Sequence, residues 1–184
     1  MKIFVSRFFQ ENIEIKEKSR QLLADKIIEL ADILDKSFQR GNRVFAFGNG
    51  GCAGIAQQMA AAFIGRFKSG KKPKPVLCLS SEASIITTIV NDYGFDQVFK
   101  RQLEGLMQDG DVVIGFSTSG NSKNVIEGLK YAREKGAFTV ALTGESGGRL
   151  MDEADFIIKV PSSQPTHIES TFACISAILC NLID

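Results

Sequence analysis

The chain lacks several features that would commit it to a particular class of protein. It has no uncharged apolar stretch of about 18 residues, which a membrane-spanning helix requires, and its apolar start is too short for a signal peptide. Its four cysteines form no C-x-x-C pair, which predicts reduced thiols and a cytoplasmic protein. Basic residues number 22 and acidic residues 21, so no net charge attracts the chain to nucleic acid or to a membrane.

What the chain does have is a regular alternation of short apolar runs and helical patterns. After Gly41, apolar strands alternate with helices, which is typical of a parallel sheet covered on both faces. We therefore expect one α/β domain over 1–184, with a three-layer αβα core in 41–184 built on a doubly wound sheet of about five parallel strands. The predicted strands are 44–47, 75–79, 112–116, 138–142 and 156–160, and the predicted core helices are 51–67, 81–90, 95–107, 124–135 and 167–183.

Two further helices are predicted before the first strand, over 3–15 and 20–40. The second carries apolar residues at helical spacing from Leu23 to Phe38 and ends at Gly41. A small α/β domain rarely has room for two such helices on its own core. They are interpreted either as an oligomer interface or as helices packed on the same subunit.

The most informative segment runs from Ser117 to Ser122, between a buried strand and a predicted helix. Its hydroxyls belong to Ser117, Thr118, Ser119 and Ser122. The free N–H groups and the positive end of the helix dipole point to the same place as these hydroxyls. A phosphate monoester is the natural occupant of such a cradle.

A second loop at a strand end comprises Gly48, Asn49, Gly50, Gly51 and Cys52. Its glycines favour either a tight turn or close approach of the backbone to a ligand. Ala53 stands where a dinucleotide fingerprint has its third glycine, and residues 70–74 contain no carboxylate, which argues against NAD. In a doubly wound sheet, ligands bind beyond the carboxyl ends of the strands, where both loops would lie.

Two polar positions elsewhere are ambiguous. Asp92 lies between two predicted helices and either caps the second or holds sugar hydroxyls. His167 is the only histidine and is predicted to open the last helix beside Glu169, Ser170 and Thr171. It has either a structural role or a role in proton transfer.

Taken together, these segments resemble the sugar isomerase (SIS) domain family, and within it the sedoheptulose-7-phosphate (phosphoheptose) isomerases. The resemblance implies a homotetramer that uses the N-terminal helices and a site that binds a sugar phosphate. By position, Ser117, Ser119 and Ser122 would hold the phosphate, and Asn49, Asp92 and Thr118 would face the sugar. The resemblance rests on residues 47–51, 65–66, 91–95, 115–122 and 141–144.

The family's usual catalytic residues are replaced in this chain. The pattern has histidine and glutamate where Gln58 and Ala62 stand, and glutamine and histidine where Glu169 and Ala177 stand. These positions also ligate zinc in metal-bearing members, and only Glu169 offers a good ligand, so no metal or other cofactor is expected. The usual phosphate-contacting serine is replaced by Cys52.

Two functional hypotheses follow. In the first, the chain is an aldose–ketose isomerase, an intramolecular oxidoreductase that works through an ene-diol, with Glu169 as base and His167 as acid. Because residues two apart on a helix point about 200° apart, this pair would require different subunits or a pre-helical His167. In the second hypothesis, the chain binds a sugar phosphate or a protein partner without catalysis, as the similar DiaA replication-initiator-binding proteins do.

Overall fold

The computed structural model describes residues 1–65 and 70–183. Five parallel strands form one sheet in the order β2-β1-β3-β4-β5. The predicted α/β class and strand number are confirmed. The strands are β1 (Val44–Gly48), β2 (Val76–Cys78), β3 (Val112–Ser117), β4 (Phe138–Thr143) and β5 (Phe156–Lys159).

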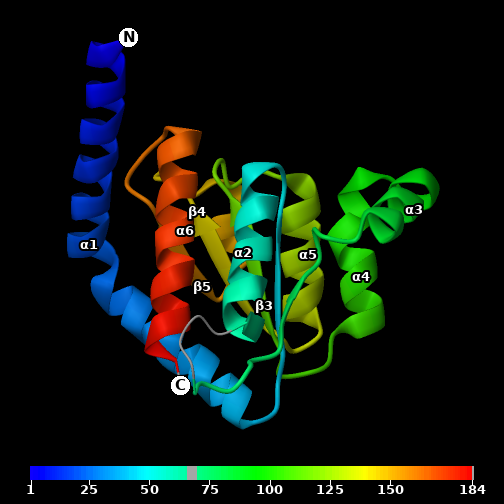
Figure 1. Cartoon of the computed structure of the whole chain (residues 1–184). Coiled ribbons are helices and arrows are strands. Elements are labelled where there is room, and N and C mark those ends of the chain that lie inside the picture. Colours follow the sequence, from blue (N-terminus) through cyan, green and yellow to red (C-terminus); the bar gives the residue numbers. More distant parts are fainter. Residues whose placement is uncertain (66–69, 184) are drawn as a thin grey trace.

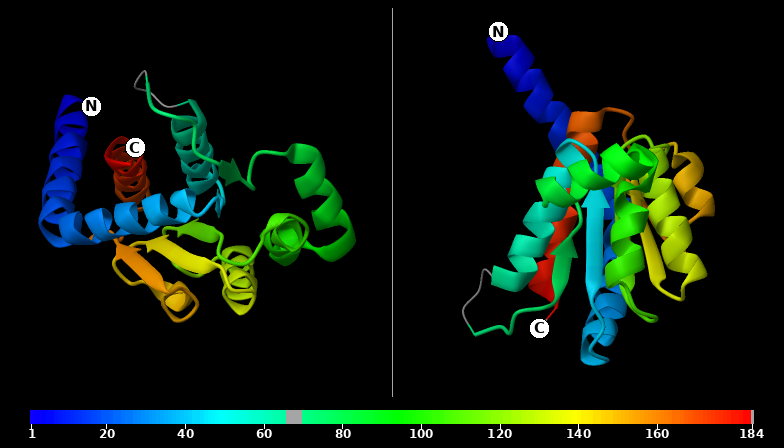
Figure 2. Two further views of the ribbon diagram at one scale, coloured as in Figure 1. Left: turned by 90° about the horizontal axis from the view of Figure 1, so that it is seen from below. Right: turned by 90° about the vertical axis from the view of Figure 1, so that its right-hand side faces the viewer.

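Helices cover both faces of the sheet (Figures 1 and 2). One apolar core joins the sheet to α1 (Lys2–Gln39), α2 (Gly51–Gly65) and α6 (Pro165–Leu182). A second core on the opposite face includes residues of α3 (Ala83–Tyr93), α4 (Val98–Leu106) and α5 (Lys123–Glu134). Two 3₁₀ helices, η1 (Phe95–Gln97) and η2 (Gly148–Asp152), complete the described elements. The predicted end of α2 at Phe67, and residues Arg66 and Asp184, lie outside the described residues.

The N-terminal region is one helix of 38 residues, so the prediction of two separate helices was wrong. Residues 16–19 contain no glycine or proline that would interrupt the helix. Ser19 is buried, and its hydroxyl donates to the carbonyl of Ile15 at 2.8 Å, within the helix. The ribbon bends in this region, and its first part stands away from the body (Figure 1).

The two parts of α1 differ in burial. Leu23, Ile27, Leu30 and Leu34 are buried, which confirms the apolar stripe. The first half instead exposes a run of large apolar side chains. These are Ile3, Phe4, Val5, Phe8, Phe9 and Ile13.

The strand order places the point of reversal between β1 and β3, which are paired neighbours. Each of these strands runs into a loop and then a helix, β1 into α2 and β3 into α5. Ligand sites of doubly wound sheets lie at this position, beyond the carboxyl ends of the strands. No helix among residues 1–65 and 70–183 has the length and apolar character needed to cross a bilayer.

Candidate active site

The loops after β1 and β3 are joined by a pair of amides. Nδ2 of Asn49 donates to Oδ1 of Asn124 at 2.8 Å, and Nδ2 of Asn124 donates back to Oδ1 of Asn49 at 2.8 Å. Asn124 is buried, and its Oδ1 also accepts the N–H of Val125 at 3.0 Å. Asn124 therefore positions Asn49, a role that the sequence analysis missed. The sequence signal that could have indicated this role is the position of Asn124 in the first turn of the helix after the serine loop.

Three serine hydroxyls gather at the start of α5. Oγ of Ser117 lies 3.0 Å from Oγ of Ser122 and 3.5 Å from Oγ of Ser119. Ser122 is the N-cap residue of α5, but its side chain makes no capping hydrogen bond. The first N–H groups of the helix are therefore left without that partner, next to the hydroxyls. This arrangement can bind a dianion through hydroxyls, amides and the helix dipole.

The serine loop is braced from behind by residues 144–150. The N–H of Gly144 donates to the carbonyl of Thr118 at 3.0 Å, and the N–H of Leu150 donates to the carbonyl of Gly120 at 2.9 Å. Gly120 has φ +67°, and a Cβ there would collide with the backbone of Gly147. Backbone contact therefore fixes the shape of the phosphate cradle.

Glu169 belongs to α6, and its carboxylate lies at the start of α2, beside the first loop. A Cβ on Gly51, the first residue of α2, would collide with the Glu169 carboxylate, so the missing side chain makes room for that group. The positive end of a helix dipole favours a carboxylate at this place. The structure therefore brings Glu169 to the glycine loop, as a base in this site requires.

Cys52 lies between Glu169 and the serine loop. Its Sγ is 3.9 Å from Oε1 of Glu169 and also interacts with the backbone of Thr118. Burial first, and the nearby Glu169 carboxylate second, raise the pKa of the Cys52 thiol to about 11, and the Thr118 backbone opposes the shift. Cys52 is therefore a neutral thiol at pH 7.

His167 faces away from Glu169 and contacts α1. Its Nδ1 lies 3.0 Å from Nδ2 of Asn12, its Nε2 lies 3.5 Å from Oε2 of Glu11, and its ring packs on Phe8 with the centroids 4.5 Å apart. The side chain is buried. The predicted pair of Glu169 and His167 is not assembled within one protomer.

The start of α6 differs from the prediction. The helix begins at Pro165 rather than at His167, because proline suits the first turn of a helix. His167 is therefore helical, and the pre-helical alternative was wrong. The hydroxyl of Ser170 lies 3.4 Å from Oδ1 of Asn12, and that of Thr171 donates to the carbonyl of His167 at 2.9 Å, so neither caps the helix start.

Asp92 does not cap the following helix, so the capping interpretation was wrong. It is an exposed residue of α3 that accepts a hydrogen bond from Nδ2 of Asn91 at 2.7 Å. Gly94, with φ +86°, is the residue that precedes η1. Among the described residues, no hydrogen bond joins Asp92 to the serine loop or to the glycine loop.

The family's zinc positions do not fit a metal in this chain. Ala62 is buried in the core, where its carbonyl lies 3.2 Å from Sγ of Cys180, and Ala177 offers only a methyl group. Gln58 is exposed. In the part of the chain that the structure describes, no three His, Cys, Asp or Glu side chains gather as a metal site would require.

The fold and the anion cradle define a phosphosugar-binding domain, and comparison with known proteins agrees. The SIS domain model matches residues 7–144, and the chain belongs to this family. The chain is 42% identical to the phosphoheptose isomerase of Aquifex aeolicus, over 98% of this chain and 94% of that protein. It also superposes on two solved phosphoheptose isomerases, covering 98% of this chain and 96% of each.

The first of these structures is GmhA from Neisseria gonorrhoeae, with a TM-score of 0.92 and 33% identity. The second, from Francisella tularensis, has a TM-score of 0.95 and 29% identity. The similarity therefore covers the N-terminal helix as well as the core.

Proposed function

We propose that the chain is a phosphoheptose isomerase that interconverts sedoheptulose 7-phosphate and its aldose isomer. The observation that carries this proposal is the position of Glu169 beside the glycine loop, next to the serine cradle at the point of strand reversal. Full-length similarity to phosphoheptose isomerases supports it. We also propose a role in carbohydrate metabolism, and a cytoplasmic location because the four cysteines form no C-x-x-C pair.

In the proposed reaction, Ser117, Ser119 and Ser122 hold the phosphate, and Glu169 removes a proton from the carbon next to the carbonyl. The carbonyl oxygen takes up a proton, which gives a neutral ene-diol. Glu169 then returns its proton to the former carbonyl carbon, and the hydroxyl oxygen on the carbon that was first deprotonated loses a proton and becomes the new carbonyl oxygen. Asn49 keeps one amide N–H beyond its bond to Asn124, and we propose that this N–H meets a sugar hydroxyl.

The proposed acid, which protonates the carbonyl oxygen, is His167. His167 is held by α1 in its own protomer, so we propose it as an acid only for a site completed by a neighbouring copy. Thr118 and Asp92 remain proposed sugar contacts. Asp92 would reach the sugar from α3.

The proposal is tested by turnover and binding together. Purified protein is expected to convert sedoheptulose 7-phosphate, and the sugar phosphate is expected to raise the melting temperature. Ser122→Ala removes one hydroxyl from the cradle and is expected to weaken binding about tenfold, the worth of a hydrogen bond to a charged group. Isothermal titration calorimetry with inorganic phosphate measures this effect.

A second function is favoured by one observation, the replacement of the family's glutamate and histidine by Ala62 and Ala177. On this alternative, the chain binds a sugar phosphate or a protein partner, such as a replication initiator, without catalysis. Stabilisation by sugar phosphates without turnover of any of them would support this alternative and contradict the isomerase.

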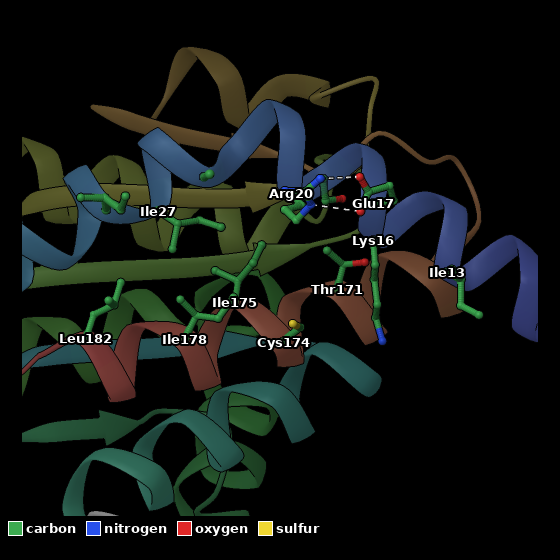
Figure 3. A pocket seen from close by; sticks show the side chains of 13 residues that line it. Ile13, Lys16, Glu17, Arg20, Ile27, Thr171, Cys174, Ile175, Ile178 and Leu182 are labelled. Carbon is green, nitrogen blue, oxygen red and sulfur yellow. Dashed lines mark hydrogen bonds and ion pairs between the residues drawn. The ribbon is translucent and has the colours of Figure 1, made fainter.

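We also propose that the chain forms a homo-oligomer, of the tetrameric kind that the resemblance implies. An apolar groove of about 600 Å³ runs between α1 and α6, as Figure 3 shows. Ile13, Ile27, Ile175 and Ile178 line it. Polar side chains of α1 lie between Ile13 and Ile27, where Arg20 donates to Glu17 at 2.6 and 3.0 Å. This groove and the exposed apolar run of residues 3–13 share Ile13 and together form an extended apolar surface along α1.

Charge placed in the exposed run is expected to break this association. The double variant Phe4→Asp, Phe9→Asp removes two aromatic side chains that are 69% and 66% exposed in the protomer, and should reduce the oligomer to smaller species. Light scattering after size exclusion measures the mass. Gln10→Asp adds charge to the same half of α1 without removing apolar surface and should leave the mass unchanged. A monomeric native protein would contradict the proposal.

A further inference from the structure

The thiol of Cys52 is directed at Glu169 and not at the serine cradle. Cys52 is 4% exposed, and its Sγ lies 3.9 Å from Oε1 of Glu169. Among the described residues, no hydrogen bond joins it to Ser117, Ser119 or Ser122. Cys52 occupies the place of a phosphate-contacting serine, but its contacts are with the carboxylate.

The direction of this thiol is fixed by close packing. A Cβ on Gly48 would lie 2.6 Å from Cβ of Cys52 and 2.9 Å from the carbonyl oxygen of Phe116. The backbone of Gly48 is therefore packed closely against both residues. The backbone of Thr118 engages Sγ from the side of the serine loop. The S–H hydrogen faces the carboxylate, because Sγ is the donor in the contact with Oε1 of Glu169 at 3.9 Å.

The protonation state suits a donor. Because burial and the charge of Glu169 keep this thiol protonated at neutral pH, it carries a hydrogen and no charge that would repel the carboxylate. On the other side, the bare Cα of Gly51 leaves space for Glu169 and supplies no side-chain contact. Cys52 is therefore the side chain that constrains the carboxylate within the loop.

We propose that Cys52 is a positioning residue for the base, which donates a hydrogen bond from its thiol to Glu169 and couples it to the serine loop through Thr118. This inference rests on the proposed isomerase function. The proposed role differs from phosphate binding because it acts on the orientation and protonation of the carboxylate.

The experiment compares Cys52→Ala and Cys52→Ser in kinetics. The alanine variant is expected to lower kcat about three- to tenfold, the effect of one modest hydrogen bond, with KM little changed. The acidic limb of the pH dependence of kcat should move to higher pH, because the carboxylate has lost a donor that favours its charged form. The serine variant retains a donor and is expected to keep the native limb. Cys180→Ala removes another thiol that is 4% exposed, at the far end of α6, and should leave the limb in place.

Two results of these measurements overturn the inference in different ways. A phosphate-contacting Cys52 would instead show weaker binding of inorganic phosphate in Cys52→Ala, with the pH limb unmoved. A purely structural Cys52 would lower stability and move neither the limb nor phosphate binding.

If the native protein does not turn over a sugar phosphate, the proposed function fails, and infrared spectroscopy still decides the inference. The S–H stretching band of Cys52 is assigned as the band that is absent from Cys52→Ser. Its frequency should shift in Glu169→Gln. A band that does not shift would exclude the hydrogen bond.

Discussion

Replacing Glu169 by glutamine is expected to lower kcat about 10²- to 10⁴-fold while sugar phosphate still binds. The amide has almost the shape of the carboxylate, but it cannot accept the proton from carbon. The cradle of Ser117, Ser119 and Ser122 does not depend on this side chain, so binding of the phosphate should persist. Turnover of sedoheptulose 7-phosphate and the ligand-induced rise in melting temperature are the two measurements.

The matched control is Glu134→Gln, which removes the same charge from an exposed position at the far end of α5. Its kcat should equal that of the native protein. Unchanged turnover in Glu169→Gln would exclude Glu169 as the base. Loss of both turnover and ligand binding would show that the change had disturbed the cradle.

Replacing Gly120 by alanine is expected to destabilise the fold by about 1–3 kcal/mol and to abolish binding of phosphate. The residue has φ +67°, where an L side chain is strained, and its added Cβ would lie 2.6 Å from the carbonyl carbon of Gly147. The backbone segments at Gly120 and Gly147 cannot move apart easily, because the N–H of Leu150 donates to the Gly120 carbonyl at 2.9 Å. Urea denaturation and phosphate calorimetry measure the two effects.

Two other glycines separate the causes of this loss. Gly41 has φ +83° with nothing within 4 Å of its added Cβ, so Gly41→Ala should show the backbone strain alone. Gly54 lies exposed in α2 with the same free space and no positive φ, so Gly54→Ala should stabilise the protein slightly. Phosphate binding that survives in Gly120→Ala would show that the brace behind the loop is not required.

The sequence predicted most of the fold because its strands are short apolar runs bounded by turns, and each of the five was found. It predicted the break in α1 wrongly. The apolar periodicity weakens over residues 16–19, but the high helix propensity of Lys16, Glu17 and Lys18 maintains the helix there. Periodicity reports burial, and a helix that leaves the core continues without it.

The candidate site was predicted in part. The sequence predicts the serine cradle from a local pattern and Glu169 from the family resemblance, and in the structure three serine hydroxyls gather and the Glu169 carboxylate lies beside Gly51. The contacts of His167 with Phe8, Glu11 and Asn12 could not be predicted, because they join residues more than 150 positions apart. The link between Asn49 and Asn124 was missed because it also joins distant residues, 75 positions apart. Spacing along the chain carries no information on which loop meets which.

A single turn of α6 carries both His167 and Glu169. His167 contacts the first half of α1, and the Glu169 carboxylate reaches the glycine loop. The first half of α1 and the Glu169 carboxylate are thus both positioned by the N-terminal part of α6. The contacts of α1 with His167 and the place of the carboxylate beside Gly51 therefore depend on the position of the same helical turn.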